Sequence, residues 1–117
     1  MHSSMGSLLD GFSQVPDLVN RCKELGYKSA ALTDHGTLSS IVDLFQECKK
    51  ADIKAIAGCE LYVCDGSATD RTGENRGLSH LVVLCKNLAG WYELVKLVSM
   101  SNRKENMYYK PRVDYDM

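Results

Sequence analysis

The chain has 117 residues, a hydrophobic fraction of 44%, a charged fraction of 25% and a formal net charge of −1. This length and composition are typical of one packed domain, or of part of one. No apolar run approaches the roughly 20 residues that a membrane-spanning helix needs, and the start, M-H-S-S-M-G-S, lacks the features of a signal peptide. We therefore expect no membrane partner. The balanced charge also means that a nucleic-acid partner would need a local basic patch.

The cysteines predict a reducing compartment. Their number, five, is odd, no CxxC pair occurs, and all of them lie within apolar segments. They are Cys22, Cys48, Cys59, Cys64 and Cys85. These features favour buried, reduced thiols over a disulfide framework, and so a cytoplasmic protein.

The first predicted elements are a helix and a short strand. Residues 15–25 carry apolar side chains at the spacing of one helix face. Pro16 suits the first turn of this helix, and Gly26 suits its end. Residues 27–33 then form an apolar strand, which ends where the sequence turns to Asp34-His35-Gly36.

A second helix and a second strand follow. Thr37 is a candidate cap for the helix, whose apolar stripe runs from Ile41 to Cys48. Residues 53–64 are predicted to form the strand, which is interrupted by Gly58 and Glu60.

The rest of the chain contains a polar loop, a third strand and a third helix. The loop covers residues 65–77 and has no evident apolar anchor, and the strand covers residues 80–85. The helix begins near Asn87, and the tail from residue 106 has no clear period. Helices and strands in this order predict an α/β fold. Because no strand precedes the first helix, we expect the chain to be a piece of a larger α/β domain.

Several ionisable residues lie at the ends or interruptions of apolar segments. They are His2, Asp10, His35, Glu60 and His80, with Asp34 beside them. Binding sites of parallel α/β folds form at the carboxyl ends of the strands. His35 meets this rule directly, and Glu60 meets it if Gly58 breaks the strand. His80 opens its strand, so it can join the site only if that strand runs antiparallel.

Imidazoles and carboxylates together suit zinc, manganese or iron better than calcium or magnesium. Ligands contributed singly from several strand ends are typical of phosphoester hydrolases with two or three metal ions.

Each of these residues also has a simpler interpretation. Asp34 could cap the following helix, His2 could belong to a mobile terminus, and Asp10-Gly11 could be an ordinary turn. His80 could be a histidine satisfied by a local hydrogen bond. Glu60 is harder to explain without a partner, because an uncompensated buried carboxylate is strongly destabilising.

Five segments in this order resemble the polymerase-and-histidinol-phosphatase (PHP) family. They are H-S-S-M-G-S-L-L-D-G, A-L-T-D-H-G, G-C-E-L-Y-V, S-H-L-V-V-L-C-K-N and Y-Y-K-P-R-V-D. The first, third and fifth point to the N-terminal PHP domain of bacterial and phage DNA polymerase III alpha subunits. The resemblance implies a distorted seven-stranded α/β barrel with metal ions at one mouth. Residues 1–117 would be a partial domain, roughly the first half, truncated at both ends and without the first strand.

Carried over by position, the resemblance also implies a ligand set. The metal ligands would be His2, Asp10, His35, Glu60 and His80. Of these, His35, Glu60 and His80 would serve catalysis, and Asp34 would orient a ligand instead of binding metal itself. The intact protein would hold two or three divalent cations, zinc or manganese first and magnesium or iron next.

The sequence departs from the family pattern in three places. The first histidine of the family's opening H-x-H is absent, and the stretch from His2 to Asp10 is one residue longer than usual, with Gly6 as the extra residue. The later ligands of the family would lie beyond Met117.

The resemblance leaves three functions open. The intact protein would use its PHP domain as a metal-dependent phosphoesterase, a 3′–5′ exonuclease beside the polymerase. Alternatively, the domain would be a non-catalytic scaffold that braces the polymerase and binds a proofreading exonuclease subunit. A free-standing phosphatase is the third option. We expect the 117-residue chain alone to be inactive, and its partners to be DNA and the rest of the polymerase chain. Candidate phosphate contacts are Arg71, Arg76, Lys110 and Arg112.

Overall fold

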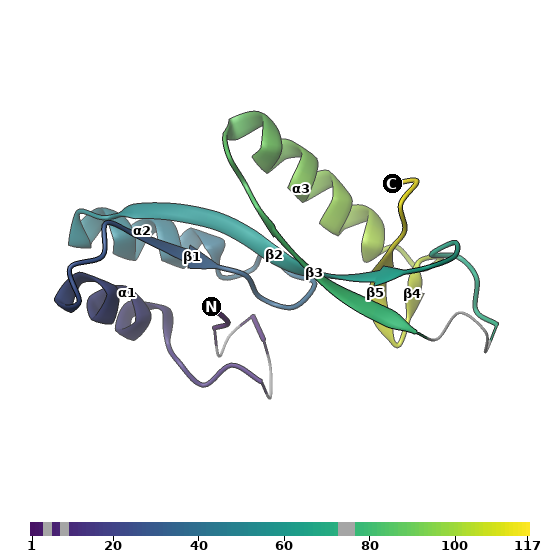
Figure 1. Ribbon diagram of the computed structural model, residues 1–117, viewed down its shortest axis with the longest axis horizontal. Coiled ribbons are helices and arrows are strands. Elements are labelled where there is room, and N and C mark those ends of the chain that lie inside the picture. The colour runs from purple at the N-terminus through teal and green to yellow at the C-terminus, as the bar shows by residue number, and fades with distance from the viewer. Residues whose placement is uncertain (4–5, 8–9, 73–76) are drawn as a thin grey trace.

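The computed structural model describes residues 1–3, 6–7, 10–72 and 77–117. Its helices are α1 (Val15–Glu24), α2 (Ile41–Ala51) and α3 (Leu88–Ser101). Its five strands are β1 (Ser29–Leu32), β2 (Lys54–Cys64), β3 (Leu78–Leu84), β4 (Met107–Tyr108) and β5 (Lys110–Val113). Together they form one mixed sheet around β2 (Figure 1). The predicted α/β fold is confirmed, and the tail, which has no sequence period, supplies β4 and β5.

Helix α1 begins and ends as the sequence predicts, and α3 begins where it predicts. Pro16 lies in the first turn of α1, and the chain leaves this helix through Gly26, whose φ is +76°. Asn87 caps α3, because its side-chain oxygen accepts a hydrogen bond of 3.0 Å from the Gly90 N–H.

The start of α2 differs from the prediction. The cap position is Ser40, and no side chain caps it. The Thr37 hydroxyl instead accepts a hydrogen bond of 3.2 Å from the Ser39 N–H, within the turn that precedes the helix. The expectation that Thr37 caps this helix is therefore wrong.

Strand β2 has two successive sets of partners. Its first four residues pair with β1 in parallel, and residues 58–64 pair with β3 antiparallel. On the edge opposite β3, the end of β2 pairs in parallel with β5. Gly58 lies where the pairing changes, and the strand continues through it unbroken. The condition that Gly58 breaks the strand is therefore not met, and the glycine instead permits the close approach of Thr33 and Val83.

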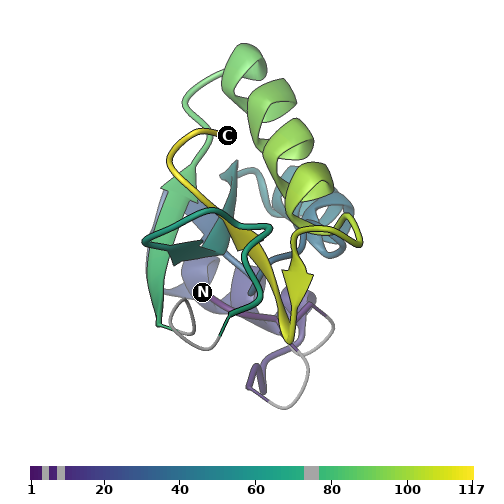
Figure 2. The ribbon, with the colours of Figure 1, turned by 90° about the vertical axis from the view of Figure 1, so that its right-hand side faces the viewer.

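Side chains alternate between the two faces of β2, as expected for a strand. Cys59, Leu61 and Val63 pack with Leu94 and Val98 of α3 in one apolar cluster. Ala57, on the same face, belongs to the cluster that joins β1 with α1 and α2. The helices therefore cover one face of the sheet. The N-terminal residues lie on the other side of the sheet from α3 (Figures 1 and 2).

The polar loop has an anchor that its sequence does not reveal. Ala68 is fully buried, its N–H donates to Asp114 Oδ2 (2.7 Å), and its carbonyl accepts from Arg112. Arg112 itself is 1% exposed. The loop is thus tied to the end of β5, and the expectation of a loop without an apolar anchor is wrong.

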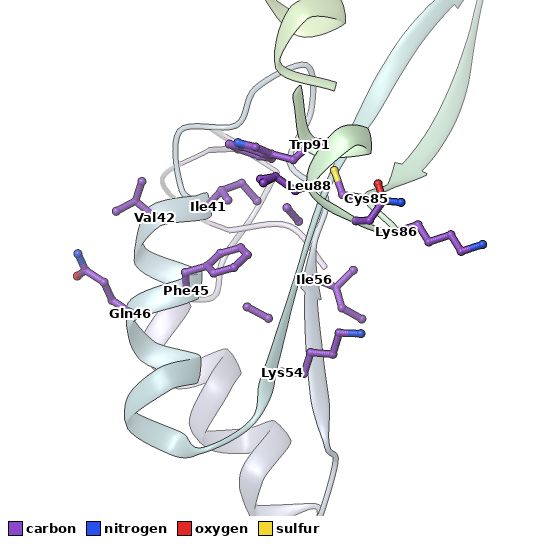
Figure 3. A pocket seen from close by; sticks show the side chains of 13 residues that line it. Ile41, Val42, Phe45, Gln46, Lys54, Ile56, Cys85, Lys86, Leu88 and Trp91 are labelled. Atoms are coloured by element: carbon purple, nitrogen blue, oxygen red, sulfur yellow. The ribbon is translucent and has the colours of Figure 1, made fainter. Parts of the chain in front are cut away.

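An apolar groove of about 550 Å³ lies between α2 and the start of α3, beside the first residues of β2 (Figure 3). Phe45 and Leu88 line it and are 50% and 65% exposed. Cys85 also lines the groove and is only partly buried, whereas the other four cysteines are buried, and all five are free thiols. Among the described residues, no helix is both long and apolar enough to span a bilayer.

The close packing around Gly58 gives a stability test. A Cβ atom at this position would lie 2.6 Å from the Val83 carbonyl oxygen and 2.9 Å from Thr33 Cγ2. We expect Gly58→Ala to lower the free energy of unfolding by about 1–3 kcal/mol, because strand backbones must move apart. The urea midpoint measures this. Gly77→Ala is the control, since nothing lies within 4 Å of a Cβ there. Equal losses in the two variants would contradict the prediction.

Candidate metal centre

The register of β1 and β2 brings His35 and Glu60 together. Residues of β1 pair with residues 25 positions later in β2, as in Leu32 with Ala57. The same offset continues past the end of β1, where His35 and Glu60 form an isolated parallel bridge. The Glu60 N–H donates to the Asp34 carbonyl (3.0 Å), and the Gly36 N–H donates to the Glu60 carbonyl (2.9 Å). Directly paired side chains share a face, so the imidazole and the carboxylate lie on the face opposite the helices.

Three imidazoles surround the carboxylate of Glu60, which is 8% exposed. His2 Nε2 lies 3.0 Å from Oε2, His80 Nδ1 lies 2.5 Å from Oε1, and His35 Nδ1 lies 3.2 Å from Oε1. These histidines come from the N-terminal segment, from β3 and from the loop after β1. Glu60 can therefore lie within an apolar strand because three imidazoles compensate its buried carboxylate.

The antiparallel direction of β3 explains how His80 reaches the site. His80 is paired with Tyr62, two residues after Glu60 on the same face of β2. The condition under which His80 could join the site is therefore met. The Tyr62 ring lies edge-on to His80, with ring centroids 5.0 Å apart, and stacks on His35 at 6.1 Å. Tyr62 was not among the predicted site residues, although its place two positions after Glu60 was a usable signal.

Asp10 approaches the same group from a turn. Its N–H donates to the Ser7 carbonyl, so Asp10 is part of a turn, as the simpler interpretation held. Its carboxylate nevertheless contacts His35 Nε2 and lies 3.9 Å from His2 Nδ1. The turn thus holds Asp10 against the imidazoles, and the two interpretations are compatible.

Asp34 anchors the N-terminal segment. Its predicted role as a residue that orients a ligand stays a prediction. Its carboxylate accepts hydrogen bonds from the Ser3 N–H (2.5 Å), the Ser3 hydroxyl (2.7 Å) and the Ser7 hydroxyl (3.1 Å). Asp34 therefore does not cap α2. Ser7 Oγ also accepts from the His35 N–H (3.2 Å), so Asp34 bears on the backbone of His35 through Ser7. Through Ser3 it fixes the residue next to His2.

Gly6 has a specific role beside Asp34. A Cβ atom on Gly6 would lie 2.0 Å from Asp34 Oδ2, and the Gly6 N–H donates to Ser3 Oγ (2.9 Å). The residue that sequence comparison marks as extra is therefore required for the close packing of this segment. Ser3 and Ser7, both buried, were missed by sequence reasoning. No local signal marks them, because their partner Asp34 is 31 and 27 residues away.

The electrostatics of the site favour an ionised Glu60. Burial raises the pKa of the Glu60 carboxyl, but the hydrogen bond from His80 and the positive charge of the three imidazoles outweigh burial, so its pKa lies below the ordinary value. The neighbouring thiol behaves differently. Burial raises the pKa of Cys59 to about 11, so this thiol stays protonated at neutral pH and is a poor metal ligand.

The donor set fits a divalent cation. Ligand atoms of His2, His35 and Glu60 lie within 4.8 Å of one another. The buried His35 Nδ1 has no hydrogen-bond partner among the described residues, although it lies near Glu60 Oε1. A ring nitrogen without a hydrogen bond beside an ionised carboxylate is suited to metal coordination. Asp10 contacts His35 and His80 contacts Glu60, so the five predicted ligand residues form one connected cluster. Their role as a joint ligand set stays a prediction.

The predicted phosphate contacts are scattered by the fold. Arg112 is buried against the loop at Ala68, so its assignment as a phosphate contact is wrong. Arg71 donates to the Lys104 carbonyl (2.5 Å) at the surface, and Arg76 lies outside the described residues. Only Lys110, among the described candidates, lines the open pocket of about 450 Å³ that also contains Asp10, His35 and His80.

Comparison with known proteins agrees with this geometry. The family model for the PHP domain matches residues 1–117. DNA polymerase III alpha subunits from Treponema pallidum and Chlamydia pneumoniae are 44% and 41% identical over 100% and 97% of this chain. The subunit from Aquifex aeolicus is 38% identical over 95% of it. This chain spans only 9% to 10% of the length of these relatives.

A solved structure from Bifidobacterium adolescentis, provisionally named a metal-dependent phosphoesterase, shares the fold. Its TM-score is 0.55 at 16% identity, over 82% of this chain and 30% of its own. The α/β sheet, with histidines and carboxylates gathered on one face, is part of a PHP barrel, and this chain belongs to the PHP domain family. Within that family it is similar to the PHP region of DNA polymerase III alpha subunits.

Metal titration tests the site directly. We expect the chain to bind Mn²⁺ or Zn²⁺, and His35→Ala to weaken binding by more than about 100-fold, because even the loss of a residue behind a ligand costs about 10–100-fold. Isothermal titration calorimetry measures the affinities. Asp17→Asn on the exposed side of α1 is the control, and equal affinities for His35→Ala and this control would contradict the assignment.

Proposed function

We propose that this chain is the PHP region of a DNA polymerase III alpha subunit, and that its site is a metal-dependent phosphoesterase acting as a 3′–5′ exonuclease. The observation that carries the proposal is the convergence of three imidazoles on the buried carboxylate of Glu60, with Asp10 beside them. A site that only stabilised the fold would not need to open into a pocket.

The residues have distinct tasks in this proposal. His2, Asp10, His35, Glu60 and His80 would hold two or three divalent cations, zinc or manganese first and magnesium or iron next. Bound cations of this kind act as Lewis acids toward a phosphoryl group. Glu60 keeps its negative charge, which compensates the cations, and its position on β2 fixes the three imidazoles relative to one another. Asp34 and Ser7 hold the His35 backbone, so that its ring need not reorganise on binding.

The proposal also implies partners and a location. The substrate would be the 3′ end of DNA, presented beside the polymerase active site by the rest of the alpha chain. Such a protein would work in the cytoplasm. A free-standing phosphatase is disfavoured, because relatives at 38% to 44% identity are polymerase subunits about ten times longer than this chain.

A scaffold role is the second candidate, and the apolar groove favours it. Val42, Phe45 and Leu88 are at least half exposed around the groove, which shares no lining residue with the metal pocket. Exposed apolar surface of this kind marks a docking face. A scaffold could brace the polymerase or hold a proofreading subunit, whether or not the metal site turns over substrate.

The two candidates are separated by a nuclease assay on the full-length alpha chain that contains this region. With Mn²⁺ and a primer carrying a mispaired 3′ end, we expect 3′–5′ cleavage by the parent protein. His35→Ala should remove it, by a factor of at least about 100, while polymerase activity is kept. Asp17→Asn is the control for folding.

The decisive outcomes are opposite. Cleavage that persists in His35→Ala would assign the activity to another site. A parent protein that binds metal and polymerises but never cleaves would leave the scaffold role as the function of the domain.

A further inference from the structure

One basic side chain, that of Lys110, lines the pocket beside the candidate metal ligands but is not one of them. Lys110, the first residue of β5, lines the pocket together with Asp10, His35 and His80. Its side chain is exposed, and no acidic residue in the described part of the chain forms an ion pair with it. The two carboxylates of the site, those of Glu60 and Asp10, contact the imidazoles instead.

The backbone fixes Lys110 at this place. Tyr62 pairs with Arg112 in the parallel register of β2 and β5, so Lys110, two residues earlier, lies on the same face as Tyr62. Pro111 packs tightly against Gly36, where a Cβ atom would lie 2.7 Å from Pro111 Cγ. Gly36 has a φ of +63°, which also favours glycine. The turn after His35 and the start of β5 are therefore held together.

The Tyr62 ring holds the ammonium group near the imidazoles. Lys110 Nζ lies 5.2 Å from the centroid of this ring, within the range of a cation–π contact. The same ring stacks on His35 and meets His80 edge-on. Tyr62 is 6% exposed and so offers a fixed surface. The ring therefore links the ammonium group to the two imidazoles that it contacts.

We propose that Lys110 binds the phosphate group of the substrate at this site and is not a metal ligand. An ammonium is a compact charge with three donors, well suited to the non-bridging oxygens of a phosphate. The inference rests on the proposed phosphoesterase function for the reaction, but the affinity for phosphate can be measured without turnover.

The first experiment measures binding of inorganic phosphate to the Mn²⁺-loaded full-length alpha chain by calorimetry. We expect Lys110→Gln to weaken phosphate binding by about 10-fold, the effect of losing one charged hydrogen-bond donor. Lys110→Arg should keep most of the affinity, since it keeps the charge, and Mn²⁺ affinity should be unchanged in both variants. Lys49→Gln on the exposed side of α2 is the matched control.

The second experiment measures cleavage of a single-stranded oligothymidylate. We expect Lys110→Gln to raise KM by about 10-fold with a smaller change in kcat, because the contact is made in the bound substrate as well as in the transition state. This arm also distinguishes a DNA phosphodiester from a free phosphate ion: an effect on phosphate binding with none on KM would overturn the assignment to the substrate.

Two further outcomes would overturn the inference. One is a phosphate affinity for Lys110→Gln equal to that of Lys49→Gln. The other is loss of Mn²⁺ binding in Lys110→Gln, which would make Lys110 a structural part of the metal centre. Absence of cleavage in the parent protein would instead refute the proposed exonuclease, and the phosphate titration would still decide the role of Lys110.

Discussion

A single buried carboxylate shared by three imidazoles is the interaction on which this structure depends. Glu60 would be strongly destabilising in an apolar strand if it had no partner. His2, His35 and His80 supply those partners from three segments that are distant in the sequence. The arrangement requires that each of these three segments be held in one conformation. That constraint accounts for the close packing at Gly6, Gly36 and Gly58.

Strand β2 makes the convergence possible because it changes partners along its length. Its first part continues the parallel order of β1, and its second part accepts β3 antiparallel and β5 parallel. One face of the strand packs against a helix, through Cys59, Leu61 and Val63. The other face is left for Glu60 and Tyr62. The same alternation therefore produces both the core and the site, and a shift of one residue in register would exchange them.

The sequence predicted those features that are set by local spacing. The helices at residues 15–24 and 88–101 follow from their apolar period, and the cap at Asn87 follows from its residue type. Long-range partners could not be predicted in this way. The residue type and position of Asp34 suggest a helix cap, but its carboxylate accepts hydrogen bonds from the Ser3 and Ser7 hydroxyls instead. Gly58 was a candidate for a strand break, but the strand continues through it, and its missing side chain leaves room for Thr33 and Val83. Arg112 was predicted to be a surface cation that contacts phosphate. It is buried instead, because its guanidinium donates to the Ala68 carbonyl. The five candidate residues stand out because they lie at the ends or interruptions of apolar segments. Their assignment as one ligand set came only from the family resemblance, since their spacing carries no local signal.

The most direct test of the central claim uses the fact that the chain contains three histidines. Mn²⁺ is paramagnetic, so a bound ion broadens the proton resonances of nearby rings. The account predicts that all three imidazole signals broaden together on addition of sub-stoichiometric Mn²⁺, while the ring signals of Tyr27, exposed before β1, stay sharp. It also predicts that Glu60→Gln abolishes this joint broadening. An imidazole signal that stays sharp while the others broaden, or unchanged broadening in Glu60→Gln, would contradict a metal centre built around Glu60.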